Sequence, residues 1–369
     1  MIYLDNAATS FIKPPSVYRS VQRAMMSASN PGRGSHQSAM NAAEIVFSCR
    51  EAAAELFHLS DPSQVVFTYN ATHALNLAIH SVVRPGMRVL ISGFEHNAVT
   101  RPLNALGADI RVAGRSLFDA QALLNDFREK MNAADAVVCT HVSNVFGFEI
   151  PIDDIALLCR ERDVPLIIDA SQSAGLLDLN MERLGAAFIA MPGHKALFGP
   201  QGTGLLLCGI PGTPLLFGGT GSDSLNQNMP EALPERLEAG TLNVPGIAGL
   251  LAGIEYVRDR GVESIHACEQ SLLQMTIDRL SSNPYLRLYS DQNRSQCGIL
   301  SFTVIGTDSE SFCEALSQKG IAVRGGFHCA PLAHRSAGTI DGGTVRISLS
   351  PFVAPEQLEK ACRIIRDMF

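Results

Sequence analysis

The chain of 369 residues is 46% apolar and 18% charged, a composition typical of globular proteins, and its length favours two domains over a single core. Its net charge of −7, without a stripe rich in Lys or Arg, argues against binding to nucleic acid or to an anionic membrane surface. The sequence shows no signal-peptide pattern and no apolar run long enough to span a bilayer. Its nine scattered cysteines, without close C-x-x-C pairs, indicate reduced thiols in a cytoplasmic protein, and neither a disulfide framework nor a metal site is expected.

The elements predicted before residue 65 are helices. Pro14 and Pro15 mark the end of a short irregular segment. Helices are then expected over residues 16–27 and 39–56, on either side of a turn-rich loop at residues 30–36.

From Val65 onward, short apolar strands alternate with helices. Strands are expected at residues 65–69, 88–92, 109–112, 136–139, 165–169, 187–190 and 204–208, and helices at 72–83, from about 98, at 118–131 and at 152–162. Near-continuous apolar strands separated by helices predict a parallel sheet covered on both faces. Ligands of such sheets bind at the carboxyl ends of the strands.

The composition changes after Gly209. Residues 210–235 are rich in Gly, Pro, Ser and Asn, which predicts an excursion or an interface loop. Helices at about 246–258, 262–281, 308–319 and from 354, with strands at 286–288, 298–302 and 343–349, then give an α+β pattern. We therefore expect a large domain of residues 15–250, and a small domain that combines residues 1–14 with residues 251–369.

The stretch from Asp169 to Lys195 carries the first candidate site. Asp169 ends an apolar strand, and Lys195 follows a Gly-His turn in surroundings without other charges. An acid that keeps a pyridine nitrogen protonated, together with a buried lysine of lowered pKa, is what a pyridoxal 5′-phosphate (PLP) site requires. Each residue also has an ordinary alternative, a helix cap for Asp169 and a lysine that reaches solvent for Lys195.

Two further strand ends carry polar side chains. The turn that holds Thr72 and His73 lies between a strand and a helix, where free amides and a hydroxyl could bind phosphate. His96 follows another strand end and could stack on an aromatic cofactor, although a surface or capping histidine fits the pattern equally well.

A second candidate region lies near the C-terminus. Cys329 follows His328 in a Gly-rich loop that begins at Arg324, which suggests an exposed and activated thiolate; a buried structural cysteine is the alternative. Arg346 is a lone cation in an apolar strand and needs a partner, either a substrate carboxylate or an internal acid.

Together these segments resemble the class V aminotransferase family, which has the PLP-dependent transferase fold type I, and within it the cysteine desulfurases. The likeness covers nearly the whole chain, and the motifs that match in order and spacing are residues 3–9, 141–145, 169–173, 193–195 and 236–243. The loop from Arg324 to Cys329 resembles the short catalytic-cysteine loop of the SufS/CsdB-type (group II) desulfurases, which include selenocysteine lyases. The resemblance implies an α/β fold with a mostly parallel, seven-stranded type of sheet and a smaller α+β C-terminal domain.

The resemblance also implies which residues bind the cofactor ring. Lys195 would carry PLP and move the Cα proton, and Asp169 would pair with the pyridine nitrogen. Gln172 would bond the phenolic oxygen, His96 would stack on the ring, and Asn144 would lie beside both cofactor and substrate.

The phosphate and the oligomer are implied in the same way. Thr72 and His194, with backbone amides near His73, would hold the phosphate. Thr241 would reach the phosphate bound by the neighbouring subunit, which implies a homodimer.

The implied reaction converts L-cysteine into L-alanine. Asn144, Arg324 and Arg346 would bind the substrate carboxylate, and Cys329 would accept the sulfur as a persulfide, with its pKa lowered by His328 and Arg324. An acceptor protein would then take the sulfur, for an iron–sulfur scaffold, a thiolation enzyme or a selenium pathway.

Three residues depart from the family pattern, and three other functions stay open. Pro192 stands where a serine is common, and Ala71 and His73 replace a threonine and a glutamate of the phosphate turn. The alternatives are a selenocysteine lyase, another class V reaction on a small amino acid, and a non-catalytic sulfur-relay scaffold.

Overall fold

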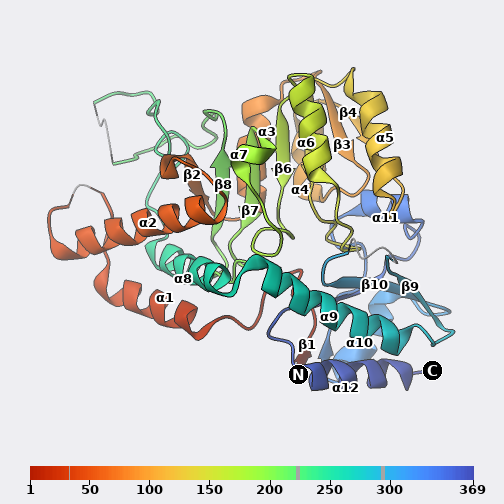
Figure 1. The fold of residues 1–369 in the computed structure, drawn as a ribbon. Coiled ribbons are helices and arrows are strands. Elements are labelled where there is room, and N and C mark those ends of the chain that lie inside the picture. Colours follow the sequence, from red (N-terminus) through yellow and green to blue (C-terminus); the bar gives the residue numbers. More distant parts are fainter. Residues whose placement is uncertain (33, 222–224, 292–295) are drawn as a thin grey trace.

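The computed structural model describes residues 1–369 except residues 33, 222–224 and 292–295. A seven-stranded sheet in the order β2-β8-β7-β6-β5-β3-β4 forms the centre of the fold (Figure 1). Its strands are β2 (Val65–Thr68), β3 (Arg88–Ser92), β4 (Asp109–Ala113), β5 (Ala136–Thr140), β6 (Leu166–Asp169), β7 (Phe188–Pro192) and β8 (Gly204–Cys208). The predicted α/β class with a mostly parallel sheet is confirmed.

One strand departs from the prediction of a parallel sheet. β8 pairs antiparallel with both of its neighbours, β2 and β7, whereas the other adjacent pairs are parallel. The segment between β7 and β8, residues 193–203, contains no helix. A parallel return needs a crossover of a dozen or more residues, usually with a helix, so this short connection brings the strand back antiparallel.

Helices cover both faces of the sheet because neighbouring strand residues point to opposite sides. In β5, Val138 packs with α3 and α4, whereas Val137 and Cys139 pack with α2, α5, α6 and α8 on the other face. These helices are α2 (Gln37–Leu56), α3 (Ala71–Val82), α4 (Asn97–Ala105), α5 (Ala120–Met131), α6 (Ile152–Glu161) and α8 (Val244–Arg260). α1 (Pro15–Ser27) lies against α8 at the edge of this layer (Figure 1).

A second core lies beside the end of the large sheet. Its antiparallel sheet has the order β12-β10-β9, and its helices lie next to both chain termini in Figure 1. The elements are β9 (Leu286–Tyr289), β10 (Ile299–Val304), β12 (Val345–Ser348), α9 (Val262–Leu280), α10 (Ser309–Gln318) and α12 (Pro355–Arg366). The N-terminal strand β1 (Ile2–Tyr3) pairs with β11 (Ile321–Ala322), so the two ends of the chain share this core.

Several short elements and one boundary complete the comparison with the predictions. The sequence patterns did not predict β1, β11, the 3-10 turn η1 (Pro62–Gln64), α7 (Met181–Leu184) or α11 (Pro331–Ala337). The domain boundary expected after residue 250 falls inside α8 and stays a prediction. Part of the expected 210–235 loop, residues 222–224, lies outside the described residues. Among the described residues, the structure has no helix both long and apolar enough to cross a membrane.

Candidate active site

The candidate site begins where two neighbouring parallel strands end. β6 ends at Asp169 and pairs with β7, whose last residue Pro192 leads into the turn Gly193-His194-Lys195. Because parallel strands end at the same edge of a sheet, Asp169 and Lys195 lie together. Asp169 is only 2% exposed, and its Oδ1 accepts a hydrogen bond from the Ser171 amide at 2.9 Å.

Lys195 has an amine that protein atoms enclose. Burial lowers the pKa of this amine to about 8, although the negative charge of Asp169 acts in the opposite direction. Burial disfavours the charged form of a lysine, so near neutral pH a usable fraction of the amine is unprotonated and nucleophilic. The lowered pKa expected from the sequence is therefore found.

A cavity of about 200 Å³ opens in front of Asp169 and Lys195. Seven of the twelve predicted site residues line it: Thr72, His96, Asn144, Asp169, Gln172, His194 and Lys195. The carboxyl end of the sheet therefore brings together side chains from five strand-to-helix or strand-to-loop connections, as the α/β pattern predicts.

The N-terminus of α3 forms one wall of the cavity. Asn70, Ala71 and Thr72 border the space, and the Asn70 side chain caps the helix by accepting the His73 amide at 2.9 Å. The expected phosphate contact through the His73 amide is therefore already taken in this structure. The first-turn amides and the Thr72 hydroxyl are the groups that remain at this anion-attracting end.

The ring of His73 points away from the cavity. It stacks on Tyr69 with ring centroids 4.9 Å apart, and it lines a different pocket, which also contains Thr241. Within this one chain, neither His73 nor Thr241 borders the cavity of Lys195.

Two histidines of the cavity are neutral at ordinary pH. His96 caps α4 by accepting the Ala98 amide on Nδ1 at 3.0 Å, and burial lowers its pKa. Burial also lowers the pKa of His194 to about 4, and its Nδ1 forms a hydrogen bond with the Thr9 hydroxyl at 3.0 Å. An uncharged His96 suits contact with an aromatic ring, and the predicted capping role holds at the same time.

Arg346 has the internal partner that the sequence left open. It is 2% exposed, and its guanidinium donates to Asp5 Oδ1 at 2.8 Å and to the Asn144 carbonyl at 2.7 Å. The other carboxylate oxygen of Asp5 accepts from Arg324 at 3.1 Å. Asp5 therefore joins both predicted carboxylate-binding arginines, while the buried Arg346 Nε has no hydrogen-bond partner among the described residues.

The loop of Cys329 is attached to the edge of the cavity. The Cys329 carbonyl accepts from the Asn97 amide at 2.8 Å, and the His328 carbonyl accepts from Asn144 Nδ2 at 2.8 Å. Cys329 is exposed, which excludes the alternative of a buried structural cysteine. Both His328 and Cys329 have left-handed backbones, with φ of 50° and 55°, a strained arrangement that is concentrated at functional sites.

The expectation of a cationic His328 beside the thiol is wrong. The imidazole of His328 is buried against Thr344, and burial lowers its own pKa to about 2. It therefore stays neutral and supplies no positive charge to Cys329. A charged His328 was expected because the loop was predicted to be exposed. A histidine that packs inward is neutral, because burial disfavours the charged form of the imidazole.

Two acids at the site received no role from the sequence. Asp5 lies 341 positions from Arg346, so no local pattern links them. Glu95 is fully buried beside His96, accepts from Ser92 Oγ and from the Thr140 amide, and has a pKa raised to about 8 by burial. Its position after an apolar strand could have indicated a buried support for the strand ends.

The model of the aminotransferase class-V family matches residues 2–360. The chain belongs to the class V aminotransferase family. Members of this family depend on PLP, and the enclosed amine of Lys195, the buried acid Asp169 and the helix end at Thr72 fit that cofactor.

Class V relatives with similar sequences are named as probable cysteine desulfurases. One from Methanothermobacter thermautotrophicus is 30% identical, over 97% of this chain and 92% of its own length. One from Xylella fastidiosa is 33% identical, over 98% of this chain and 89% of its own length. A third, from Mycolicibacterium paratuberculosis, is 31% identical over 99% of this chain, which spans 55% of that longer protein.

Solved structures agree with this placement. The apo cysteine desulfurase of Thermococcus onnurineus superposes with a TM-score of 0.91 at 28% identity, covering 100% of this chain and 94% of that one. The Escherichia coli cysteine desulfurase CsdA, in an S-sulfonic acid form, has a TM-score of 0.86 at 25% identity, with 99% and 94% coverage. The PLP-dependent transferase fold expected from the resemblance is confirmed.

Proposed function

We propose that this chain is a PLP-dependent cysteine desulfurase that converts L-cysteine into L-alanine and keeps the sulfur on Cys329. The observation that carries the proposal is the cavity in which Lys195 and Asp169 meet, with the exposed Cys329 loop attached to its rim through Asn97 and Asn144. The class V relatives named as cysteine desulfurases support it.

The chain's own residues would hold the cofactor at both ends. Lys195 would attach it, and the Asp169 carboxylate would keep its ring nitrogen protonated. His96 would stack on the ring, and Gln172, whose amide already donates to the Ala7 carbonyl at 3.1 Å, would reach its phenolic oxygen. PLP, when bound, supplies an electron sink that stabilises negative charge on the substrate Cα.

The phosphate end would lie against α3. Thr72 and the first-turn amides supply donors there, and the neutral His194 is fixed by Thr9. Pro192 lines the same cavity without a hydroxyl, so the chain would hold the phosphate with one side-chain donor fewer than desulfurases that carry a serine. We expect Thr241 of a second copy to supply a further contact, which would make the site a property of a homodimer.

The substrate carboxylate would bind at Arg346, with Arg324 and Asn144 nearby. Both arginines donate to Asp5 in this structure, so a substrate carboxylate would compete with Asp5 for the N–H groups at the edge of the guanidinium. The unpartnered Nε of Arg346 is the donor that a carboxylate could reach without that competition.

Lys195 would then remove the Cα proton as its free amine. The thiolate of Cys329 would attack the substrate sulfur, forming the S–S bond of a persulfide while the carbon–sulfur bond breaks. The bonding electron pair would stay on the carbon fragment, which takes up protons and leaves as alanine. The short loop that ends at Cys329 supports assignment to the SufS/CsdB-type group II enzymes. A cytoplasmic location and a separate sulfur-acceptor protein are part of the same proposal.

Product analysis tests this proposal. The holoenzyme is incubated with L-cysteine and, in parallel, with L-selenocysteine, and alanine, sulfide and selenide are measured with a thiol reductant present. We expect one alanine per sulfur from cysteine, and a strong loss in Cys329→Ala but not in the matched variant Cys313→Ala. Elimination products other than alanine would contradict the proposal. Turnover confined to selenocysteine, with Cys329 dispensable, would instead establish the lyase alternative, which the relatives do not favour.

A further inference from the structure

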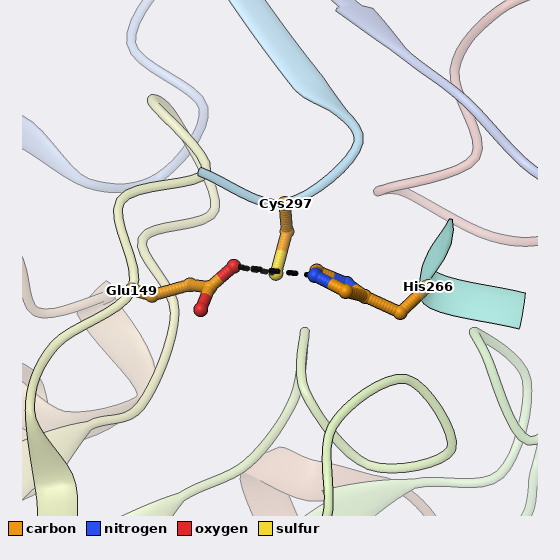
Figure 2. A group of neighbouring side chains, drawn as sticks. All are labelled: Glu149, His266 and Cys297. Atoms are coloured by element: carbon orange, nitrogen blue, oxygen red, sulfur yellow. Dashed lines mark hydrogen bonds and ion pairs between the residues drawn. The ribbon is translucent and has the colours of Figure 1, made fainter. Parts of the chain in front are cut away.

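A cluster of three different metal-ligand side chains lies outside the cavity of Lys195. Glu149 follows β5, His266 is in the first turns of α9, and Cys297 lies two residues before β10. Figure 2 shows their side chains pointing toward one another. The Cys297 Sγ lies 3.3 Å from Glu149 Oε1, and His266 Nε2 lies 3.9 Å from the same oxygen. All three ligand atoms are within 4.8 Å of one another.

The cluster is enclosed and incompletely satisfied. Cys297 is 1% exposed, and about a quarter of the side chains of Glu149 and His266 remains exposed. Gln270 approaches His266 Nε2, the atom that faces the other two ligands, only at 3.4 Å. The buried Nδ1 on the other side of the ring, which would not bind the ion, has no hydrogen-bond partner among the described residues. Apart from the thiol, no described residue supplies a hydrogen bond or cation to the Glu149 carboxylate within normal distance.

From this geometry we infer that Glu149, His266 and Cys297 form a binding site for one zinc ion. A thiolate, an imidazole and a carboxylate are the ligand types that zinc takes in proteins, and oxygen-seeking ions such as magnesium and calcium would not favour the thiolate. Two anionic ligands would balance the charge of the ion. The fourth tetrahedral position would be open to a water molecule. The inference does not depend on the proposed function.

The observed separations are near those of a tetrahedral site, and the side chains must adjust to reach them. Zinc bonds of about 2.3 Å to sulfur and about 2.0–2.2 Å to nitrogen and oxygen place S and O, or S and N, about 3.5–3.7 Å apart and N and O about 3.3–3.6 Å apart. The S–O separation of 3.3 Å must lengthen slightly and the N–O separation of 3.9 Å must shorten by a few tenths of an ångström, while the S–N separation starts within 4.8 Å. On binding, the Cys297 thiol releases its proton to solvent, and His266 exchanges its long contact with Gln270 for the metal bond.

The ion would join three segments that are distant in the sequence. Glu149 belongs to the 141–150 segment, which also carries Asn144 at the rim of the cavity. The Cys297 amide donates a hydrogen bond to the Gly147 carbonyl of the same segment at 2.8 Å. Zinc would therefore fix the Asn144 segment between α9 and β10. Its role would be to hold these segments together, because none of its ligands lines the cavity of about 200 Å³ in front of Asp169 and Lys195. Cys297 does border a second pocket that Lys195 and Gln172 also line.

The sequence gives no indication of this site. Its three ligands are spaced by more than a hundred and by about thirty positions, whereas the familiar zinc patterns have pairs two to five residues apart. The absence of closely spaced cysteine pairs is why the sequence predicts no metal site.

The test is zinc binding to the PLP-loaded protein without substrate. After dialysis in low micromolar zinc, we expect about one zinc per chain by elemental analysis, and X-ray absorption should show one sulfur neighbour at about 2.3 Å among nitrogen and oxygen neighbours. We expect Cys297→Ser and His266→Gln to weaken zinc binding by more than about 100-fold, the upper end of what changes around a ligand shell produce. Cys268→Ser, in the same helix as His266, and Cys329→Ser should retain the zinc.

Stability supplies an independent readout. Zinc should raise the melting temperature of the wild-type holoenzyme and leave that of Glu149→Gln unchanged, because binding to the folded state stabilises it. This mild variant keeps the shape of the side chain and shows whether a loss of zinc comes from a lost ligand or from misfolding. Absence of zinc from the wild type, zinc retained by Cys297→Ser and His266→Gln, or a zinc site without sulfur would each overturn the inference.

Discussion

The cavity of Lys195 and the loop of Cys329 are built in different ways. Asp169 and Lys195 follow adjacent strands of the central sheet and are enclosed by protein. The loop from Arg324 to Cys329 lies on the second core, exposes its thiol and reaches the cavity through backbone contacts with Asn97 and Asn144. The enclosed region suits a permanently held cofactor, and the exposed loop suits the proposed transfer of sulfur to an acceptor.

The electrostatics of the two regions differ in the same sense. Burial tunes the cavity, where it lowers the pKa of Lys195 to about 8. In the loop, burial removes the charge of His328, so the thiol has no cationic histidine as a neighbour. The cavity would therefore carry the cofactor chemistry and the loop would set the choice of reaction, and each region can be altered separately.

Removal of the lysine should have the largest effect. We expect Lys195→Ala to lose covalent attachment of PLP and to reduce alanine formation by about 10²–10⁴-fold, the contribution of a positioned proton-transfer group. The absorbance of attached cofactor and the rate of alanine formation measure this. Lys130→Ala, which removes a lysine paired with Asp126 on the surface, is the control and should behave as wild type.

Removal of the thiol should separate the two regions. Cys329→Ser should bind PLP with wild-type absorbance yet form alanine from cysteine roughly 10²-fold more slowly, because the serine hydroxyl is not an acceptor for the sulfur. The absorbance of bound PLP and the rate of alanine formation are measured on the same preparation. A thiol-loop variant that also lost the cofactor would show that the regions are not independent.

The first segment of the chain links the two regions through Asp5. Asp5→Asn should lower the free energy of unfolding by about 3 kcal/mol, because it leaves the buried Arg346 without its counterion. Denaturant unfolding of the holoenzyme measures this loss. Asp109→Asn, which breaks the exposed pair with Arg111, should change stability by less than about 1 kcal/mol. Equal losses in both variants would mean that Arg346 is not held by Asp5.

A pH profile sharpens the electrostatic description of the cavity. PLP-free protein should take up the cofactor faster as the pH rises through about 8, because the neutral amine of Lys195 is the reacting form and its folded-state pKa is lowered to about 8. Asp169 acts to raise that pKa, so Asp169→Asn should move the midpoint down by about 1 pH unit. Stopped-flow absorbance at several pH values gives both midpoints, and an unmoved midpoint would exclude the coupling.

The repetitive parts of the fold could be predicted from the sequence. The bounds of β3 and β8 agree with the predicted strands, because both are short apolar runs between clear breaks. The direction of β8 could not be predicted, since a buried apolar strand has the same pattern in either direction. β1 and β11 are two residues long and pair across more than three hundred positions, so no local pattern identifies them.

The candidate site divides in the same way. The grouping of Asp169, His96 and Lys195 could be predicted from the ends of the strands, because the topology of a parallel sheet gathers these residues at one edge. The partners of the arginines and the inward orientation of His328 depend on packing between distant segments. Sequence spacing shows neither of these features. This explains why the role of Asp5 was missed and why His328 was expected to be charged.

Mass spectrometry of Cys329 after a single turnover tests the central claim most directly. The PLP-loaded protein is mixed with one equivalent of L-cysteine without reductant, alkylated, digested and mapped. The account predicts one additional sulfur on the peptide of Cys329, in an amount equal to the alanine released, and none on the peptide of the half-buried Cys313. Alanine released in full while Cys329 carries no additional sulfur would contradict the account.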